Sequence, residues 1–114
     1  MATYEIDYFE LPSESPAEGA GFFSRAFGWG SQAFGPGYVE IRDGGVLGGL
    51  NGDSADRSAA PLIGIRTDDI AAAAEAIVAA GGTITRPAYD FPGGRRLFFR
   101  VPDGVEMMVY EPAG

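Results

Sequence analysis

The chain has 114 residues and a net charge of −8, and it contains no cysteine, histidine or lysine, so arginine supplies all eight positive charges. A chain of this length fits one domain. The missing residue types exclude disulfides, thiolate nucleophiles, Schiff-base lysines, imidazole acids or bases, and zinc sites built from cysteine or histidine. The acidic balance disfavours nucleic acid and anionic membranes as partners, because both carry negative charge.

The sequence shows neither a membrane anchor nor a secretion signal. No apolar run approaches the ~20 residues that a membrane-spanning helix requires. The first ten residues, MATYEIDYFE, lack a basic region followed by an apolar stretch. We therefore expect a cytoplasmic protein with no membrane partner.

The first half of the sequence predicts a strand, a helix and three further strands. Residues 3–11 alternate and are rich in aromatic and β-branched side chains, which is typical of a strand. Ser15 supplies a helix N-cap, with Pro16 at the first helical position and Glu18 completing a capping box, and Gly28 ends the helix. The three further strands are predicted at 31–34, 38–42 and 46–50.

The second half predicts the same order after a linker. Residues 51–60 are polar and small, which indicates the linker, and 61–66 predict a strand. Asp68 and Asp69 begin a second helix, which ends at Gly81. The remaining predictions are strands at 83–85, 95–101 and 105–110, with a loop at 89–94.

The two halves repeat one another in detail. The helix starts at Ser15 and Asp68 lie 53 positions apart, and so do the helix ends at Gly28 and Gly81. This indicates an α+β fold of two tandem βαβββ units, at about 3–50 and 61–111, within a single domain. Because neither unit could bury its sheet alone, we expect the units to pack together with their helices outside and a cleft between their free faces.

Six short motifs in order resemble the vicinal oxygen chelate superfamily, which includes glyoxalase I, extradiol dioxygenases and bleomycin-resistance proteins. The resemblance covers essentially the whole chain and implies the same paired βαβββ fold. The motifs are Tyr8-Phe9-Glu10-Leu11-Pro12, Phe22-Phe23, Phe27-Gly28-Trp29, Asp68-Asp69-Ile70, Ala80-Gly81-Gly82 and Val101-Pro102-Asp103-Gly104.

Enzymes of that superfamily hold a divalent metal with one ligand from each of four strands. The resemblance places those ligand positions on Tyr8, Leu47, Leu62 and Met108. None of the four is a histidine or a carboxylate, and the sequence has no histidine to shift into place. We therefore expect no metal site of the family's type and no cofactor.

Tyr8 and Glu10 share one face of the first strand and are the candidates for chemistry. Glu10 could act as a general base or anchor a cation, with Tyr8 as its acid partner. Alternatively, Glu10 pairs with an arginine such as Arg66 or Arg100. Arg66 in turn could bind a ligand carboxylate or lie at the rim as a solvated charge.

Three further residues have both a packing and a ligand-binding interpretation. Trp29 follows the first helix and could cover the seam between helix and sheet or touch a ligand. Met108 and Tyr110 share a face of the last strand, where they could line the cleft or belong to the core. Glycines of the fourth strand are expected to leave space for a ligand. The predicted ligand-binding residues are Tyr8, Glu10, Trp29, Leu47, Leu62, Arg66, Met108 and Tyr110.

Two classes of function fit this sequence. The first is a metal-free protein that binds a small aromatic or cationic molecule, as bleomycin-resistance proteins sequester a drug. The second is an enzyme of the same superfamily, a lyase or isomerase using Glu10 and Tyr8, or a dioxygenase relative with a metal held by carboxylates. We expect a homodimer, because the superfamily implies one and short strands leave sheet edges to be covered.

Overall fold

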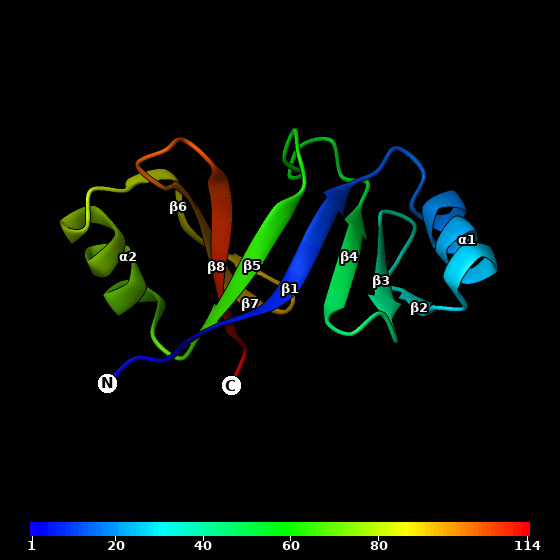
Figure 1. The fold of residues 1–114 in the computed structure, drawn as a ribbon, viewed down its shortest axis with the longest axis horizontal. Coiled ribbons are helices and arrows are strands. Elements are labelled where there is room, and N and C mark those ends of the chain that lie inside the picture. The colour runs from blue at the N-terminus through cyan, green and yellow to red at the C-terminus, as the bar shows by residue number, and fades with distance from the viewer. The chain divides into compact units, whose positions relative to one another are not determined.

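The computed structural model describes all 114 residues, which divide into two compact units. The first unit is Tyr8–Leu62, and the second unit combines Met1–Asp7 with Ile63–Gly114. Strand β1 (Tyr4–Pro12) therefore begins in the second unit and ends in the first. The other elements, labelled in Figure 1, are α1 (Pro16–Phe27), β2 (Gly30–Ala33), β3 (Tyr38–Arg42), β4 (Leu47–Asn51), β5 (Leu62–Thr67), α2 (Ile70–Ala79), β6 (Thr83–Phe91), β7 (Gly94–Arg100) and β8 (Glu106–Pro112).

The first unit has the strand order β2-β3-β4-β1. β1 and β4 run parallel, with Tyr8 opposite Leu47 and Glu10 opposite Gly49, whereas β2, β3 and β4 pair antiparallel. Successive side chains point to opposite faces of a strand, so one face of this sheet packs on α1 and the other carries Tyr8 and Glu10. The buried core on the α1 side is Ala20, Val39, Ile41 and Leu50.

The second unit has the strand order β1-β5-β8-β7-β6, with β5 and β8 parallel and β6, β7 and β8 antiparallel. Helix α2 lies on one face of this sheet. The α+β fold class and the repeated order of strand, helix and three strands predicted from the sequence are confirmed. The buried core under α2 is Ile70, Ala73, Leu97, Phe99 and Val109.

The two helices begin in different ways. Asp69 is the N-cap of α2, and its side chain accepts a hydrogen bond from the backbone N–H of Ala72 at 3.0 Å. Ser15 is the N-cap of α1, but its side chain makes no cap hydrogen bond, so the predicted capping box is wrong. The start of α1 relies instead on Pro16, whose ring sets a helical φ and whose missing N–H costs nothing at that position. Gly28 ends α1 in the left-handed conformation, with φ of 73°.

Strand β6 is longer than the sequence indicated. The predicted strand at 83–85 continues to Phe91, so most of the expected loop at 89–94 is extended chain paired with β7. Pro87 lies within this strand, although proline cannot donate to a sheet ladder. The ladder accommodates it with a register shift between Arg86 and Tyr89. Neither helix has the length and apolar character that crossing a membrane requires.

Candidate functional site

In the first unit, the sheet face away from α1 carries a pair of tyrosines. The hydroxyl groups of Tyr8 on β1 and Tyr38 on β3 are hydrogen bonded at 2.6 Å. Gly49 of β4 lies between these strands, and a Cβ built on it would overlap the Tyr38 hydroxyl and approach that of Tyr8. Gly48, facing the other way, is covered by the ring of Phe9. These glycines therefore make room for the protein's own aromatic rings, where the sequence had suggested room for a ligand.

Next to the tyrosines, one asparagine bridges two carboxylates. Glu10 and Asn51 are each only 2% exposed. The Asn51 Nδ2 group donates to Glu10 Oε1 at 3.4 Å and to Asp56 Oδ2 at 3.0 Å. The Asn51 Oδ1 atom accepts a hydrogen bond from the Asp53 backbone N–H at 2.9 Å. The cluster thus joins β1, the end of β4 and the segment after it.

That segment, the predicted linker, has an ordered structure that places Asp56. The backbone N–H groups of Asp56 and Arg57 both donate to the Asp53 carbonyl, at 3.0 and 2.8 Å. Arg57 also donates to the Ser13 carbonyl at 2.9 Å, which ties the turn to the end of β1. The turn therefore holds Asp56 beside Asn51.

In the second unit, Asp7 contacts two other predicted ligand-binding residues, Tyr110 and Arg66. The Tyr110 hydroxyl donates to Asp7 Oδ1 at 2.5 Å. Arg66 Nη1 lies 3.9 Å from Asp7 Oδ2, a long and partly exposed ion pair. Arg100, the other arginine suggested for Glu10, donates to the Gly104 carbonyl at 2.9 Å. The structure thus places Asp7, which the sequence analysis did not single out, beside Arg66 and Tyr110.

The sheet face of the second unit that α2 does not cover holds a buried arginine among aromatic rings. Arg96 is 5% exposed, and its guanidinium lies 5.0 Å from the centre of the Phe98 ring. Its Nε donates to the Tyr89 hydroxyl at 2.5 Å, and its Nη1 contacts the Met108 sulfur at 3.5 Å. Sequence reasoning missed Arg96, although strand alternation puts it on the same face as Phe98.

The other predicted residues take no part in these polar contacts. Trp29 stacks on Phe23 at 5.4 Å between ring centres and packs on the core cluster at α1. Leu62 is buried, and Leu47 is about half exposed on β4. The sequence analysis did not predict Tyr38, Asn51 or Asp56 as site residues. The alternation of side chains along β3 and β4 could have indicated that Tyr38 and Asn51 lie on the same sheet face as Glu10.

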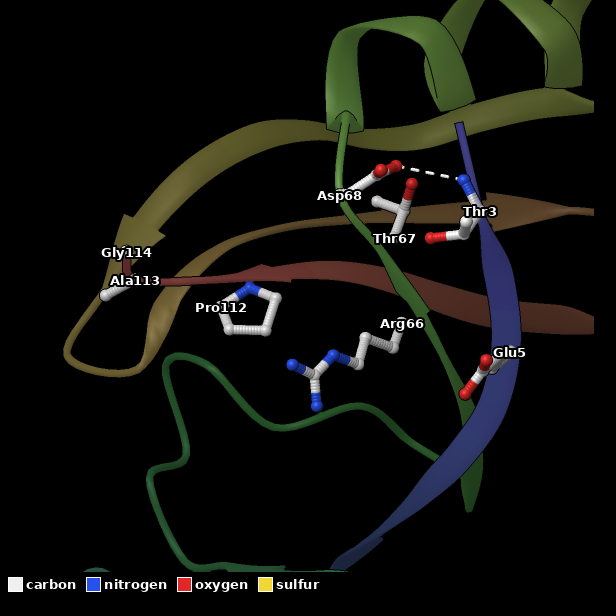
Figure 2. A pocket seen from close by; sticks show the side chains of 8 residues that line it. All are labelled: Thr3, Glu5, Arg66, Thr67, Asp68, Pro112, Ala113 and Gly114. Atoms are coloured by element: carbon white, nitrogen blue, oxygen red, sulfur yellow. Dashed lines mark hydrogen bonds between the residues drawn. The ribbon is translucent and has the colours of Figure 1, made fainter. Parts of the chain in front are cut away.

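Two pockets lie in the second unit. One, of about 480 Å³, is lined by residues from the ends of β1, β5 and β8, including Arg66 (Figure 2). The other, of about 280 Å³, lies under α2, where small residues such as Ala73 and Ala76 leave an apolar space beside Phe99.

The four positions at which the resemblance places metal ligands do not fit a metal. Tyr8 and Leu47 pair across β1 and β4, and Met108 pairs with Gly64 across β8 and β5. With Leu62, these positions offer one phenol, one thioether and two aliphatic side chains, whereas divalent metals bind imidazole, carboxylate or thiolate groups. No group of three or more acidic side chains converges as a metal site would require.

Comparisons with known proteins agree with this fold. Residues 5–109 match the family model described as Glyoxalase/Bleomycin resistance protein/Dioxygenase superfamily. No protein of curated function matches the sequence.

Solved structures with the same fold share little sequence with this chain. A structure described as an NAD-dependent benzaldehyde dehydrogenase from Legionella pneumophila has a TM-score of 0.79 at 11% identity, covering 94% of this chain and 99% of that one. Methylmalonyl-CoA epimerase from Mycobacterium tuberculosis has a TM-score of 0.66 at 15% identity, covering 96% and 88%. A superfamily member from Vibrio splendidus 12B01 has a TM-score of 0.66 at 15% identity, covering 97% and 100%. From the family match along nearly all of its length, the chain belongs to the Glyoxalase/Bleomycin resistance protein/Dioxygenase superfamily.

Proposed function

We propose that this chain is a small-molecule-binding member of the superfamily that works without the metal. The observation that carries the proposal is the burial of Glu10 and Asn51 on the sheet face that α1 leaves uncovered. Burying a carboxylate and an amide is costly unless their partners satisfy them. A protein that needed only a stable sheet would be served by apolar residues there, so the polar cluster favours a binding role.

The ligand class follows from the chemistry around this cluster. Tyr8 and Tyr38 offer two aromatic rings with hydroxyl groups, and Glu10 and Asp56 offer two carboxylates on either side of Asn51. Aromatic rings and carboxylates together suit a flat molecule that carries a cationic group. The net charge of −8 would also attract cations from a distance. The superfamily's bleomycin-resistance members suggest sequestration as the mode of action.

A thermal-shift screen of aromatic amines, with and without EDTA, tests this proposal. A ligand of the native state raises the melting temperature by mass action, and the shift should be the same with the chelator. Glu10→Gln keeps the shape and removes the charge, so it should weaken cationic ligands by about tenfold or more. Glu14→Gln makes the same charge change at an exposed position of the first unit and should leave binding unchanged. Binding that disappears with EDTA, or is equal in Glu10→Gln, contradicts the proposal.

A second candidate is a metal-free isomerase or lyase, and the Tyr8–Tyr38 pair favours it. The two hydroxyl groups are hydrogen bonded to each other at 2.6 Å, and a phenol can donate a hydrogen bond or a proton to a reacting oxygen or carbon. Glu10 would take a proton from the carbon next to a carbonyl, and the electron pair would move onto the carbonyl oxygen, stabilised by a tyrosine hydroxyl. A tyrosine hydroxyl on the opposite face would then donate a proton to the carbon, which inverts it, and exchange with solvent would return the proton from Glu10 to the tyrosine. The likeness to methylmalonyl-CoA epimerase supports this class of reaction through the fold alone.

Hydrogen–deuterium exchange at such a carbon distinguishes the two candidates. An acyl thioester incubated with the protein in D₂O should exchange its α-proton if the second candidate is right. Tyr38→Phe and Glu10→Gln should then slow the exchange by about a hundredfold. Binding of aromatic amines without exchange of the α-proton would support the first candidate and contradict the second.

The expected homodimer and cytoplasmic location also stand as proposals. In the first unit, Phe22, Phe27 and Phe34 are each more than half exposed, and such side chains support a role in self-association. Light scattering at tens of micromolar should give twice the mass of one chain, and Phe27→Ser should lower it. The mass of a single chain at that concentration would contradict the dimer.

A further inference from the structure

The pocket of about 480 Å³ in the second unit combines opposite charges in one small space. Its charged lining residues are Glu5 on β1, Arg66 on β5 and Asp68, which follows β5 directly. Figure 2 shows the Arg66 side chain extending into the pocket, with Asp68 beside Thr3 at one end and Pro112 on the far side. The volume lies within the usual range for small-molecule sites.

Arg66 is available to a ligand because of how it is held. Its side chain is 56% exposed, and its one ion pair, between Nη1 and Asp7 Oδ2, is 3.9 Å long. Asp7 is in turn held by the Tyr110 hydroxyl at 2.5 Å. A guanidinium has five N–H donors in a planar fork that matches a carboxylate, so the long contact with Asp7 leaves most of them for other acceptors.

Asp68 is kept ionised at the other end of the pocket. Its Oδ1 atom accepts the backbone N–H of Thr3 at 2.9 Å, and this hydrogen bond lowers the pKa of the carboxyl group. Arg66 lies in β5 and Asp68 follows the end of that strand, so both line the pocket from the same part of the chain. Glu5 adds a second negative charge at the β1 side of the pocket.

From this arrangement we propose that the pocket binds a small zwitterion, such as a short peptide with both ends free. The ligand's carboxylate pairs with Arg66, and its ammonium group lies at Asp68 and Glu5. A pocket lined by one guanidinium and two carboxylates suits a ligand that carries both a negative and a positive group. The site is separate from the cluster around Glu10 and does not depend on the function proposed for it.

Titration with glycylglycine, followed by amide chemical shifts of the isotope-labelled protein, tests the ligand class. The amide signals of Thr67 and Asp68 should shift in a saturable way. N-acetylglycylglycine lacks the ammonium group and glycylglycinamide lacks the carboxylate, and each should lose about tenfold in affinity. Equal affinity for glycylglycine and glycylglycinamide would overturn the proposal, since Arg66 would then have no role.

Single substitutions test the residues. Arg66→Gln and Asp68→Asn should each weaken glycylglycine by about tenfold, because each removes one charged hydrogen-bonding group. Arg95→Gln is the matched control, since Arg95 is an exposed arginine of the same unit whose partner is Asp90 and which does not line the pocket. All three variants should keep the parent's amide spectrum elsewhere. Unchanged affinity in Arg66→Gln, with the fold intact, would refute the site.

Discussion

Tyr8 and Tyr38, separated by 30 positions in the sequence, share a hydrogen bond of 2.6 Å between their hydroxyl groups. The bond is possible because Gly49 of the strand between them has no side chain on that face. Tyr8 is one of the four positions at which the resemblance to the superfamily implies a metal ligand, and here its hydroxyl is hydrogen bonded to a second phenol. The proposed function therefore rests on hydrogen bonding and charge at this pair and at Glu10.

The space at Gly49 can be tested by filling it. A Cβ at this position would overlap the Tyr38 hydroxyl, so Gly49→Ala should displace the tyrosine pair and lower the free energy of unfolding by about 1–3 kcal/mol. The matched control is Gly37→Ala, where an added Cβ meets no atom within 4 Å, and the change should stay within about 0.5 kcal/mol. Urea denaturation measures both. If the two variants have equal free energies of unfolding, the tyrosine pair can move aside for the added methyl group without a loss of stability.

The two helix starts should respond differently to alanine. Asp69→Ala removes a side-chain cap from the Ala72 N–H and should cost about 1 kcal/mol of stability. Ser15→Ala removes no cap hydrogen bond and should cost clearly less. Urea denaturation of both variants, with helix content followed by circular dichroism, gives the comparison. A larger loss for Ser15→Ala would mean that this residue caps α1 in solution.

Stability in acid should depend on Asp68. The Thr3 N–H lowers the pKa of this carboxyl below 3.8 in the folded protein, whereas the unfolded chain has the ordinary value. The folded state therefore binds the proton less readily, and the stabilising contribution is fully present above the unfolded pKa and is lost as pH falls through the folded pKa. Asp68→Asn should flatten the decline of stability below about pH 4.

The control for this measurement is Asp103→Asn, an exposed carboxyl in the turn before β8. Melting temperatures of the three proteins between neutral pH and strong acid provide the data. If Asp68→Asn and the parent lose stability in parallel, the hydrogen bond to Thr3 does not persist in solution.

Trp29 should report folding of the first unit more than ligand binding. It is the only tryptophan, and it packs on Phe23 and Phe27 at α1, whereas Tyr8 and Glu10 lie on the other face of the sheet. We expect a large change in its emission on denaturation and a change of under about a tenth when an aromatic amine binds. Suppose that a ligand quenches Trp29 strongly and that Glu10→Gln abolishes its binding. That result would contradict the prediction, because the ligand would then contact both Trp29 and the Glu10 side of the sheet.

Local signals in the sequence determined much of the fold. Proline and glycine at the ends of α1, the aspartate pair before α2 and the repeat at 53 positions specify two βαβββ segments, because these signals act over a few residues. Strand alternation then placed Tyr8 and Glu10 on the same face. The sequence indicated too short a strand for β6, because its full length shows only in the pairing with β7, where a register shift accommodates Pro87.

Which residues meet at the candidate sites depended on the tertiary structure. Asn51 lies 41 positions from Glu10, and Tyr110 lies 103 positions from Asp7. No pattern within a strand shows such a partner, because the register between strands is set by packing of whole elements and by the turns that join them. The sequence by itself determined most of the elements and the absence of histidine and cysteine, whereas the strand pairing decided that Glu10 meets an asparagine and that Arg66 faces Asp7.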